Sequence, residues 1–223
     1  MKKFIYMVAS LAFLTACHST TTTENKAETT QATATTEQTT QKSNGQADLS
    51  LGIQMVVNKK HKLPADYNPG ENPIAGEKVR ELIQKMQELG FSISNQYSGF
   101  RSYEYQTQLY QNYVNKDGKK AADTYSARPG YSEHQTGLAF DILNGTGGLL
   151  GENPQDEKAI EWLHSHAHEY GFIVRFQEGK EAITGYQAEA WHLRYVGDIA
   201  EQIYTSKLTL EEYFSVEGGN YAD

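Results

Sequence analysis

A long polar segment near the N-terminus limits how much of this chain can fold. From His18 to about Ser50 the sequence consists mainly of Thr, Gln, Ala, Glu, Asn and Ser, with almost no large apolar side chains. Such a segment cannot bury enough apolar surface to offset the loss of conformational entropy, so we expect residues 17–50 to form a disordered tether. A coil of this length spans roughly 30 Å. The folded domain is therefore expected within residues 51–223.

The segment before the tether is typical of a bacterial export signal. Lys2 and Lys3 precede a short apolar run that ends in small residues at Ala16. The run is shorter than the roughly 20 apolar residues that a membrane-spanning helix needs. Cys17 follows directly, in a pattern that resembles the lipobox, where the cysteine is lipidated. We therefore expect a signal peptide over residues 1–16 and a lipid anchor on Cys17 that holds the protein at the outer face of the cytoplasmic membrane.

Charge and cysteine content exclude several classes of partner. The formal net charge is −8, and loss of Lys2 and Lys3 with the signal peptide makes it −10. A surface this acidic disfavours binding to nucleic acid or to anionic lipid. Because Cys17 is the single cysteine, no disulfide can form within the chain. We expect a monomer that contacts the membrane through its lipid anchor only.

The pattern of apolar residues predicts an α+β domain with a mainly antiparallel sheet. Capping signals mark several helix starts: Ser102, the pair Asn153-Pro154, and Thr209 with Glu212 three residues later. The strands and helices do not alternate regularly, which disfavours a doubly wound parallel sheet. We expect strands over residues 53–57, 91–100, 138–141, 172–176 and 191–196, and helices over 76–89, 102–114, 153–170, 198–205 and from 209 onwards.

Two short segments, 132–141 and 189–195, carry the residue types of a catalytic metal site. A catalytic zinc site uses three protein ligands and one open position, which His134, Asp141 and His192 satisfy. Glu189 is then free to take a proton from water and return it to a leaving amine. Gly137 offers a bend that brings His134 and Asp141 together. Residue types alone leave open that these are ordinary polar residues, because His, Asp and Glu are common.

The two segments resemble the signature motifs of a known enzyme family. The strings Ser132-x-His134-x-x-Gly137-x-Ala139-x-Asp141 and Glu189-x-Trp191-His192-x-Arg194 are similar to those of the VanY-type D-alanyl-D-alanine carboxypeptidases. That family is grouped with lysostaphin-type endopeptidases and the Hedgehog signalling domain, a zinc fold with an antiparallel sheet. The likeness runs from about residue 55 to 204. It implies one zinc ion bound by His134, Asp141 and His192, Glu189 as general base, and a substrate pocket lined by Arg101, Gln106, Ser126, Ser132 and Tyr186.

Arginine side chains offer a way to recognise the free carboxylate that a carboxypeptidase must bind. The guanidinium of Arg101 can hold a carboxylate through two hydrogen bonds, and the alternative for this residue is a structural ion pair. Arg194 lies two residues past His192, so on a strand it shares the same face and can stabilise negative charge near the metal. Arg128 is a weaker candidate.

The remaining histidines do not form a convincing second site. On the predicted helix only His164 and His168 share a face, with His166 turned away, and we expect surface histidines there. His61 and His18 lie in a loop and in the tether, where we expect both to be solvated.

We therefore expect a zinc-dependent carboxypeptidase that removes D-alanine from peptidoglycan stem peptides. The acidity of the chain and a likeness to lipid-anchored L,D-carboxypeptidases favour cleavage of tetrapeptides to tripeptides. The alternative is D,D-carboxypeptidase activity on the D-Ala-D-Ala of pentapeptides. A non-catalytic peptidoglycan-binding or zinc-binding protein is disfavoured because Glu189 accompanies a full ligand set. A solute-binding lipoprotein is disfavoured because it would need two larger lobes.

Overall fold

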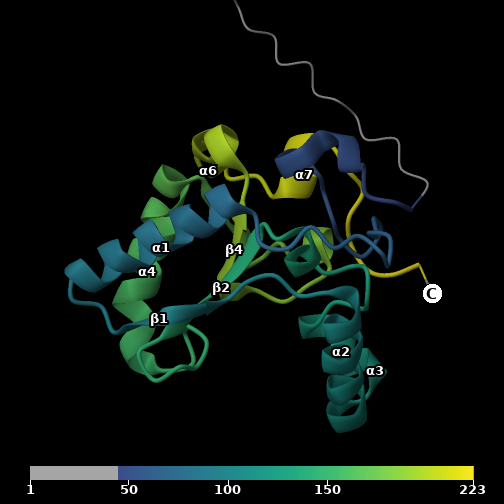
Figure 1. The fold of residues 1–223 in the computed structure, drawn as a ribbon, viewed down its shortest axis with the longest axis horizontal. Helices are drawn as coiled ribbons and strands as arrows, with labels where there is room; N and C mark the ends of the chain where they lie inside the picture. The colour runs from purple at the N-terminus through teal and green to yellow at the C-terminus, as the bar shows by residue number, and fades with distance from the viewer. Residues whose placement is uncertain (1–44, 223) are drawn as a thin grey trace, which may run out of the picture. The chain divides into compact units, whose positions relative to one another are not determined.

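The computed structural model describes residues 45–222 (Figure 1). The predicted signal peptide, Cys17, His18 and most of the predicted tether lie outside these residues. The last tether residues are already ordered, since Ala47 is buried and the Asp48 side chain caps the 3-10 helix η1 (Leu49–Gln54). The folded domain thus begins before residue 51. Among the described residues, no helix has the length and apolar character needed to span a membrane.

A four-stranded antiparallel sheet organises the domain, which confirms the predicted α+β class. The strands β1 (Ile93–Ser98), β2 (Ala139–Asn144), β3 (Phe172–Phe176) and β4 (Glu189–Tyr195) pair in the order β1-β2-β4-β3. β2 and β4 are neighbours although 44 residues separate the end of one from the start of the other. Their register sets Asp141 opposite His192. Strand pairing therefore brings together the two predicted motif segments.

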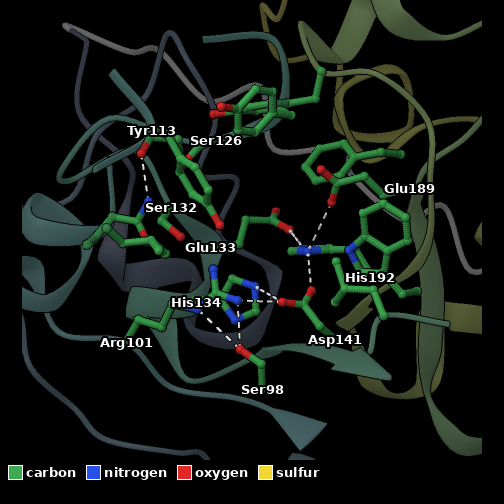
Figure 2. Close-up of a pocket in the computed structure, with 18 of the residues that line it drawn as sticks. Ser98, Arg101, Tyr113, Ser126, Ser132, Glu133, His134, Asp141, Glu189 and His192 are labelled. Atoms are coloured by element: carbon green, nitrogen blue, oxygen red, sulfur yellow. Dashed lines mark hydrogen bonds and ion pairs between the residues drawn. The ribbon is translucent and has the colours of Figure 1, made fainter. Parts of the chain in front are cut away.

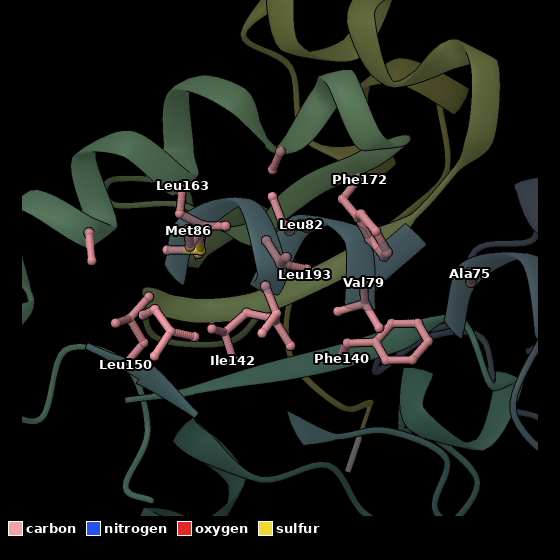
Figure 3. Close-up of a cluster of buried hydrophobic side chains, with 14 of the residues drawn as sticks. Ala75, Val79, Leu82, Met86, Phe140, Ile142, Leu150, Leu163, Phe172 and Leu193 are labelled. Carbon is pink, nitrogen blue, oxygen red and sulfur yellow. The ribbon is translucent and has the colours of Figure 1, made fainter. Parts of the chain in front are cut away.

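The hydrophobic core lies between one face of this sheet and two helices (Figure 3). α1 (Pro73–Glu88) and α4 (Glu157–His166) supply residues such as Leu82 and Leu163, both fully buried. The strands supply alternate residues, so Phe140 and Ile142 point into the core and the intervening Asp141 points to the opposite face. Each fully buried side chain of this size stabilises the fold by roughly 1.5–3 kcal/mol. Core packing therefore fixes the strand that carries Asp141.

Three helices begin at the capping residues that the sequence indicates, which are Ser102, Asn153 and Thr209. The Ser102 side chain accepts a hydrogen bond from the backbone N–H of Tyr105 at the start of α2 (Tyr103–Asp117). Thr209 and Glu212 form both halves of a capping box at α7. The other elements are α3 (Lys119–Tyr125), α5 (Glu181–Thr184), α6 (Ala200–Ser206), α7 (Leu210–Phe214), η2 (Glu133–Thr136), η3 (Pro154–Asp156), η4 (Ala167–Tyr170) and η5 (Gly197–Ile199).

One local prediction is wrong, and one helix was not predicted. Residues 53–57 form no strand: the chain leaves η1 and continues as a buried irregular segment. Met55, Val56 and Val57 are almost completely buried, and a short apolar run has the same pattern in a strand as in a buried loop. The separate helix α3 was also not expected, because its sequence has only one buried residue, Ala122.

Gly137 makes the sharp bend that the first motif needs. It ends η2 in the left-handed conformation, with φ at 72°. A side-chain Cβ at this position would lie 2.0 Å from the carbonyl oxygen of Gly70, so no other residue fits without moving the backbone. The bend places His134 before β2 and lets Asp141 approach it from within that strand.

Candidate metal centre and active site

Three side chains from different elements converge in a pocket on the sheet face opposite the core (Figure 2). His134 comes from η2, Asp141 from β2 and His192 from β4. His134 Nε2 lies 3.3 Å from Asp141 Oδ2, and His192 Nδ1 lies 3.0 Å from Asp141 Oδ1. One ligand atom of each residue lies within 4.8 Å of the others. The structure therefore brings together all three predicted metal ligands.

The donor set and its surroundings fit a zinc ion. Two imidazoles and a carboxylate make up the three protein ligands of a catalytic zinc site. Asp141 Oδ1 is buried and makes no hydrogen bond, even though His192 Nδ1 is only 3.0 Å away. A buried carboxylate oxygen without a hydrogen bond is unfavourable. A cation shared by the two side chains accounts for both the short distance and the missing hydrogen bond.

The backbone orients His134 for metal binding. Its Nδ1 lies 2.7 Å from the Gly99 carbonyl oxygen, which accepts a hydrogen bond from the ring and leaves the Nε2 lone pair facing Asp141. Burial lowers the pKa of His134, and the Arg101 guanidinium lowers it further, against the opposing effect of Asp141. The neutral imidazole, which is the form that binds metal, is therefore favoured.

Glu189 stands beside the three ligands at the start of β4. Its Oε2 lies 3.6 Å from His192 Nδ1, and the residue is 7% exposed. Burial raises the pKa of Glu189 to about 7, although His192 opposes the rise. A general base works best with a pKa near the operating pH, so this carboxylate is suited to accept and return a proton.

The pocket has a volume of about 570 Å³, and all three predicted metal ligands line it. Five of the residues predicted to bind substrate line it: Arg101, Gln106, Ser126, Ser132 and Tyr186. One face of α2 forms a wall, because its side chains at helical spacing, Tyr105, Leu109 and Tyr113, all border the pocket. This face of α2 therefore borders the pocket rather than the core.

Arg101 lies directly against a metal ligand. Its Nη2 is 2.5 Å from Asp141 Oδ2 and 2.7 Å from Ser98 Oγ. These contacts use one edge of the guanidinium group, and Nη1 carries further N–H donors. Because its side chain is 19% exposed and borders the pocket, Arg101 is placed to donate to a substrate carboxylate or carbonyl beside the metal.

The prediction of a substrate contact for Arg194 is wrong. Arg194 does share a strand face with His192, but the segment around residues 53–55 covers that part of the sheet. The guanidinium is fully buried, donating to Glu133 Oε1 at 2.8 Å and to the backbone carbonyls of Ile53 and Met55. Arg194 is therefore a structural residue that lies outside the pocket lining. Arg128 forms an ion pair with Asp123, at 2.9 Å.

The other histidines are more buried than the sequence indicated. His61 is 2% exposed, with Nδ1 at 2.8 Å from Asn58 Oδ1, so the expectation of a solvated loop histidine is wrong. His164 Nε2 donates to the Ala190 carbonyl oxygen, His166 stacks on Trp162, and His168 stacks on Tyr204. These three half-buried rings therefore have packing roles, and within residues 45–222 the His134 cluster is the sole metal-ligand group found.

Sequence reasoning missed one charged residue of the site. Glu133, between Ser132 and His134, is 4% exposed and borders the pocket. Burial would raise the pKa of its carboxyl group, but Arg175 and Arg194 outweigh this effect and hold the pKa well below its usual range. No local pattern marks Glu133, because both arginines come from strands distant in the sequence.

The chain matches a known family over most of its folded part. The sequence profile of VanY, D-alanyl-D-alanine carboxypeptidase, matches residues 68–198. The Bacillus subtilis protein YodJ is 36% identical over 183 residues, which cover 73% of this chain and 67% of YodJ. The residues that the VanY profile matches include His134, Asp141, Glu189 and His192.

Two solved structures share the fold. The crystal structure of the L,D-carboxypeptidase DacB from Streptococcus pneumoniae is 61% identical, with a TM-score of 0.72, and covers 75% of this chain and 89% of DacB. A mutant of the vancomycin-resistance D,D-pentapeptidase VanY in complex with Zn(II) is 31% identical, with a TM-score of 0.61, and covers 72% of this chain and 98% of that one.

Proposed function

The chain belongs to the VanY family of D-alanyl-D-alanine carboxypeptidases, and we propose that it removes the C-terminal D-alanine from peptidoglycan stem peptides. We further propose that it acts as an L,D-carboxypeptidase, which shortens tetrapeptides to tripeptides. The observation that carries the activity is the buried cluster of His134, Asp141 and His192 with Glu189 beside it in an open pocket. The 61% identity to an L,D-carboxypeptidase supports the specificity.

His134, Asp141 and His192 would hold one zinc ion, which supplies a Lewis acid for activating water and polarising the scissile carbonyl group. Glu189 accepts a proton from the attacking water and returns it to the amine of the departing D-alanine. Burial of Glu189 keeps its pKa high enough for both transfers near neutral pH. Zinc in the related VanY structure supports the choice of metal.

Residues around the metal position the substrate. Arg101 donates hydrogen bonds to a negatively charged oxygen of the substrate, and its contact with Asp141 fixes the guanidinium beside the reacting bond. Ser126, Ser132 and the Gln106 amide offer further polar groups in the lining of the pocket. Tyr186, buried at 5% exposure, also lines the pocket, as Glu189 does.

The choice between two stem peptides depends on the residue before the scissile bond. A tetrapeptide presents an L-centred diamino acid there, commonly lysine, whereas a pentapeptide presents D-alanine. D,D-carboxypeptidase activity is the second candidate, because the chain is also 31% identical to a D,D-pentapeptidase. A non-catalytic peptidoglycan-binding protein is a weaker candidate, since such a protein has no need of Glu189.

Purified protein should be offered tetrapeptide and pentapeptide muropeptides in equal amounts, with the products measured by mass spectrometry. The tetrapeptide should lose its terminal alanine faster. If the pentapeptide alone loses alanine and the reaction stops at the tetrapeptide, the enzyme is a D,D-carboxypeptidase. If neither is shortened in the presence of zinc, the carboxypeptidase proposal fails.

We also propose that the enzyme is anchored by lipid at Cys17 to the outer face of the cytoplasmic membrane. The support is the sequence alone: a basic start, a short apolar run and a lipobox-like ending before this cysteine. At least two acyl chains are needed for stable anchoring. Cys17→Ala should move the protein from the membrane fraction to the medium. Unchanged membrane retention of the variant would contradict the anchor.

A further inference from the structure

The Glu133 carboxylate is directed at a metal ligand. Glu133 is the first residue of η2, and its Oε2 lies 3.5 Å from His192 Nε2. Both atoms are buried, and neither has a hydrogen-bond partner within usual geometry. An acceptor and a ring nitrogen that are both buried and otherwise unsatisfied gain by pairing with each other. Figure 2 shows Glu133 and Asp141 on different sides of the His192 ring.

Two arginines fix this carboxylate through its other oxygen. Glu133 Oε1 accepts hydrogen bonds from Arg175 Nε at 2.9 Å and from Arg194 Nη1 at 2.8 Å. Arg175 also donates to both carboxylate oxygens of Glu211, at 2.8 and 2.6 Å. Two acidic and two basic side chains thus form a buried network with balanced charge. The network leaves Glu133 little freedom to turn away from His192.

The two ring nitrogens of His192 therefore have different surroundings. Nδ1 faces Asp141 Oδ1 and Glu189 Oε2, at 3.0 and 3.6 Å, whereas Nε2 faces Glu133. Histidines that bind metal usually donate their second N–H to a carboxylate or carbonyl, which fixes the tautomer and the ring orientation. For His134 that acceptor is the Gly99 carbonyl, through Nδ1.

We propose that Glu133 is a positioning residue that accepts the Nε2–H of His192 and so presents the Nδ1 lone pair of this ring to the zinc ion. The inference rests on the proposed zinc site. It makes the two histidines opposite in tautomer: His134 binds through Nε2 and His192 through Nδ1. The buried network then links the metal site to Arg175 on β3 and to Glu211 on α7.

A glutamine at position 133 would favour the opposite tautomer of His192. Arginines can only donate, so Arg175 and Arg194 would hold the amide oxygen and turn the amide NH2 group towards His192. A donor at that place favours the tautomer with the proton on Nδ1, which is the nitrogen that must bind zinc. Glu133→Gln should therefore weaken zinc binding by more than the loss of one hydrogen bond to His192 would.

The matched control is Glu211→Gln, because Glu211 is equally buried and binds the same Arg175 but does not face the metal ligands. Zinc affinity of the full-length variants should be measured by competition with a fluorescent chelator. Glu133→Gln should bind zinc about 10–100-fold more weakly than wild type. Glu211→Gln should lower the melting temperature of the zinc-free protein and leave zinc affinity nearly unchanged. Equal affinity losses in both variants, or no loss in Glu133→Gln, would overturn the inference.

A measurement on the wild type keeps the inference testable if the glutamine variant does not fold. Long-range proton–nitrogen correlation spectra of zinc-loaded, nitrogen-15-labelled protein report which nitrogen of each histidine carries the proton. His192 should be protonated at Nε2 and His134 at Nδ1. Zinc-loaded protein with His192 protonated at Nδ1 would overturn the inference and leave the zinc site intact. Failure of the wild type to bind zinc would instead reject the proposed metal site on which the inference depends.

Discussion

Replacing Glu189 by glutamine should strongly reduce activity and stabilise the zinc-free protein. Burial raises the pKa of this carboxyl group from 4.5 to about 7 in the zinc-free structure. The folded protein therefore disfavours the ionised form, and each pKa unit corresponds to about 1.4 kcal/mol. At pH 7.5 ionised Glu189 thus lowers the free energy of unfolding by roughly 3 kcal/mol. Glutamine resembles the protonated carboxyl group and avoids this loss.

The pH dependence of the stability gained in Glu189→Gln identifies the cause of that gain. Because the folded pKa lies above the unfolded one, the penalty is absent below about pH 4.5, grows between pH 4.5 and 7, and is complete above pH 7. Urea unfolding of wild type and Glu189→Gln should be compared in chelator at pH 4.5 and pH 7.5. The variant should be more stable at pH 7.5, and the difference should largely disappear at pH 4.5.

The same variant separates the base from the metal ligands. Glu189→Gln should retain zinc while kcat/KM falls about 10²–10⁴-fold. As a control, Glu152→Gln changes an exposed carboxylate at the edge of the same pocket, and its stability should shift by less than about 0.5 kcal/mol. A stability gain in Glu189→Gln that does not vary with pH would refute the burial argument. Zinc loss in this variant would place Glu189 among the ligands.

Three further predictions follow from the site. His192→Ala should lose both zinc and activity, and chelation of the wild type should abolish activity that added zinc restores; full activity in chelator would contradict the metal site. Burial lowers the pKa of His192, but the adjacent carboxylates of Asp141 and Glu133 outweigh it and raise the pKa to about 9 in the zinc-free protein. Zinc binding near pH 7 should therefore release a proton, and zinc affinity measured by calorimetry should rise with pH up to about 9 rather than stay constant. Arg101→Ala should retain zinc but lower kcat/KM about 10–150-fold, since hydrogen bonds to charged groups contribute about 1.5–3 kcal/mol; an unchanged kcat/KM would remove Arg101 from substrate binding.

Features encoded by neighbouring residues were predictable from the sequence. Ser102 and Thr209 cap helices in the structure as their local patterns indicate. Gly137 adopts the left-handed bend that its position between His134 and Asp141 requires. The two motif segments are far apart in the sequence, so local patterns do not predict that they meet. We inferred their contact from the resemblance to a family in which both motifs occur together. The register of Asp141 opposite His192 explains why that pairing forms one site.

The errors at Arg194 and Glu133 have a common physical cause, which is burial by segments distant in the sequence. Alternation along β4 correctly places Arg194 on the same face as His192, yet it cannot reveal that the segment at Ile53–Met55 covers that face. Once covered, a guanidinium group must find partners for its donors, and Glu133 and two backbone carbonyls supply them. Glu133 in turn can remain ionised next to His192 because two arginines neutralise it. Arg194, which was predicted to touch substrate, thus binds the Glu133 carboxylate, and that carboxylate faces the metal ligand His192. No sequence pattern marks Glu133.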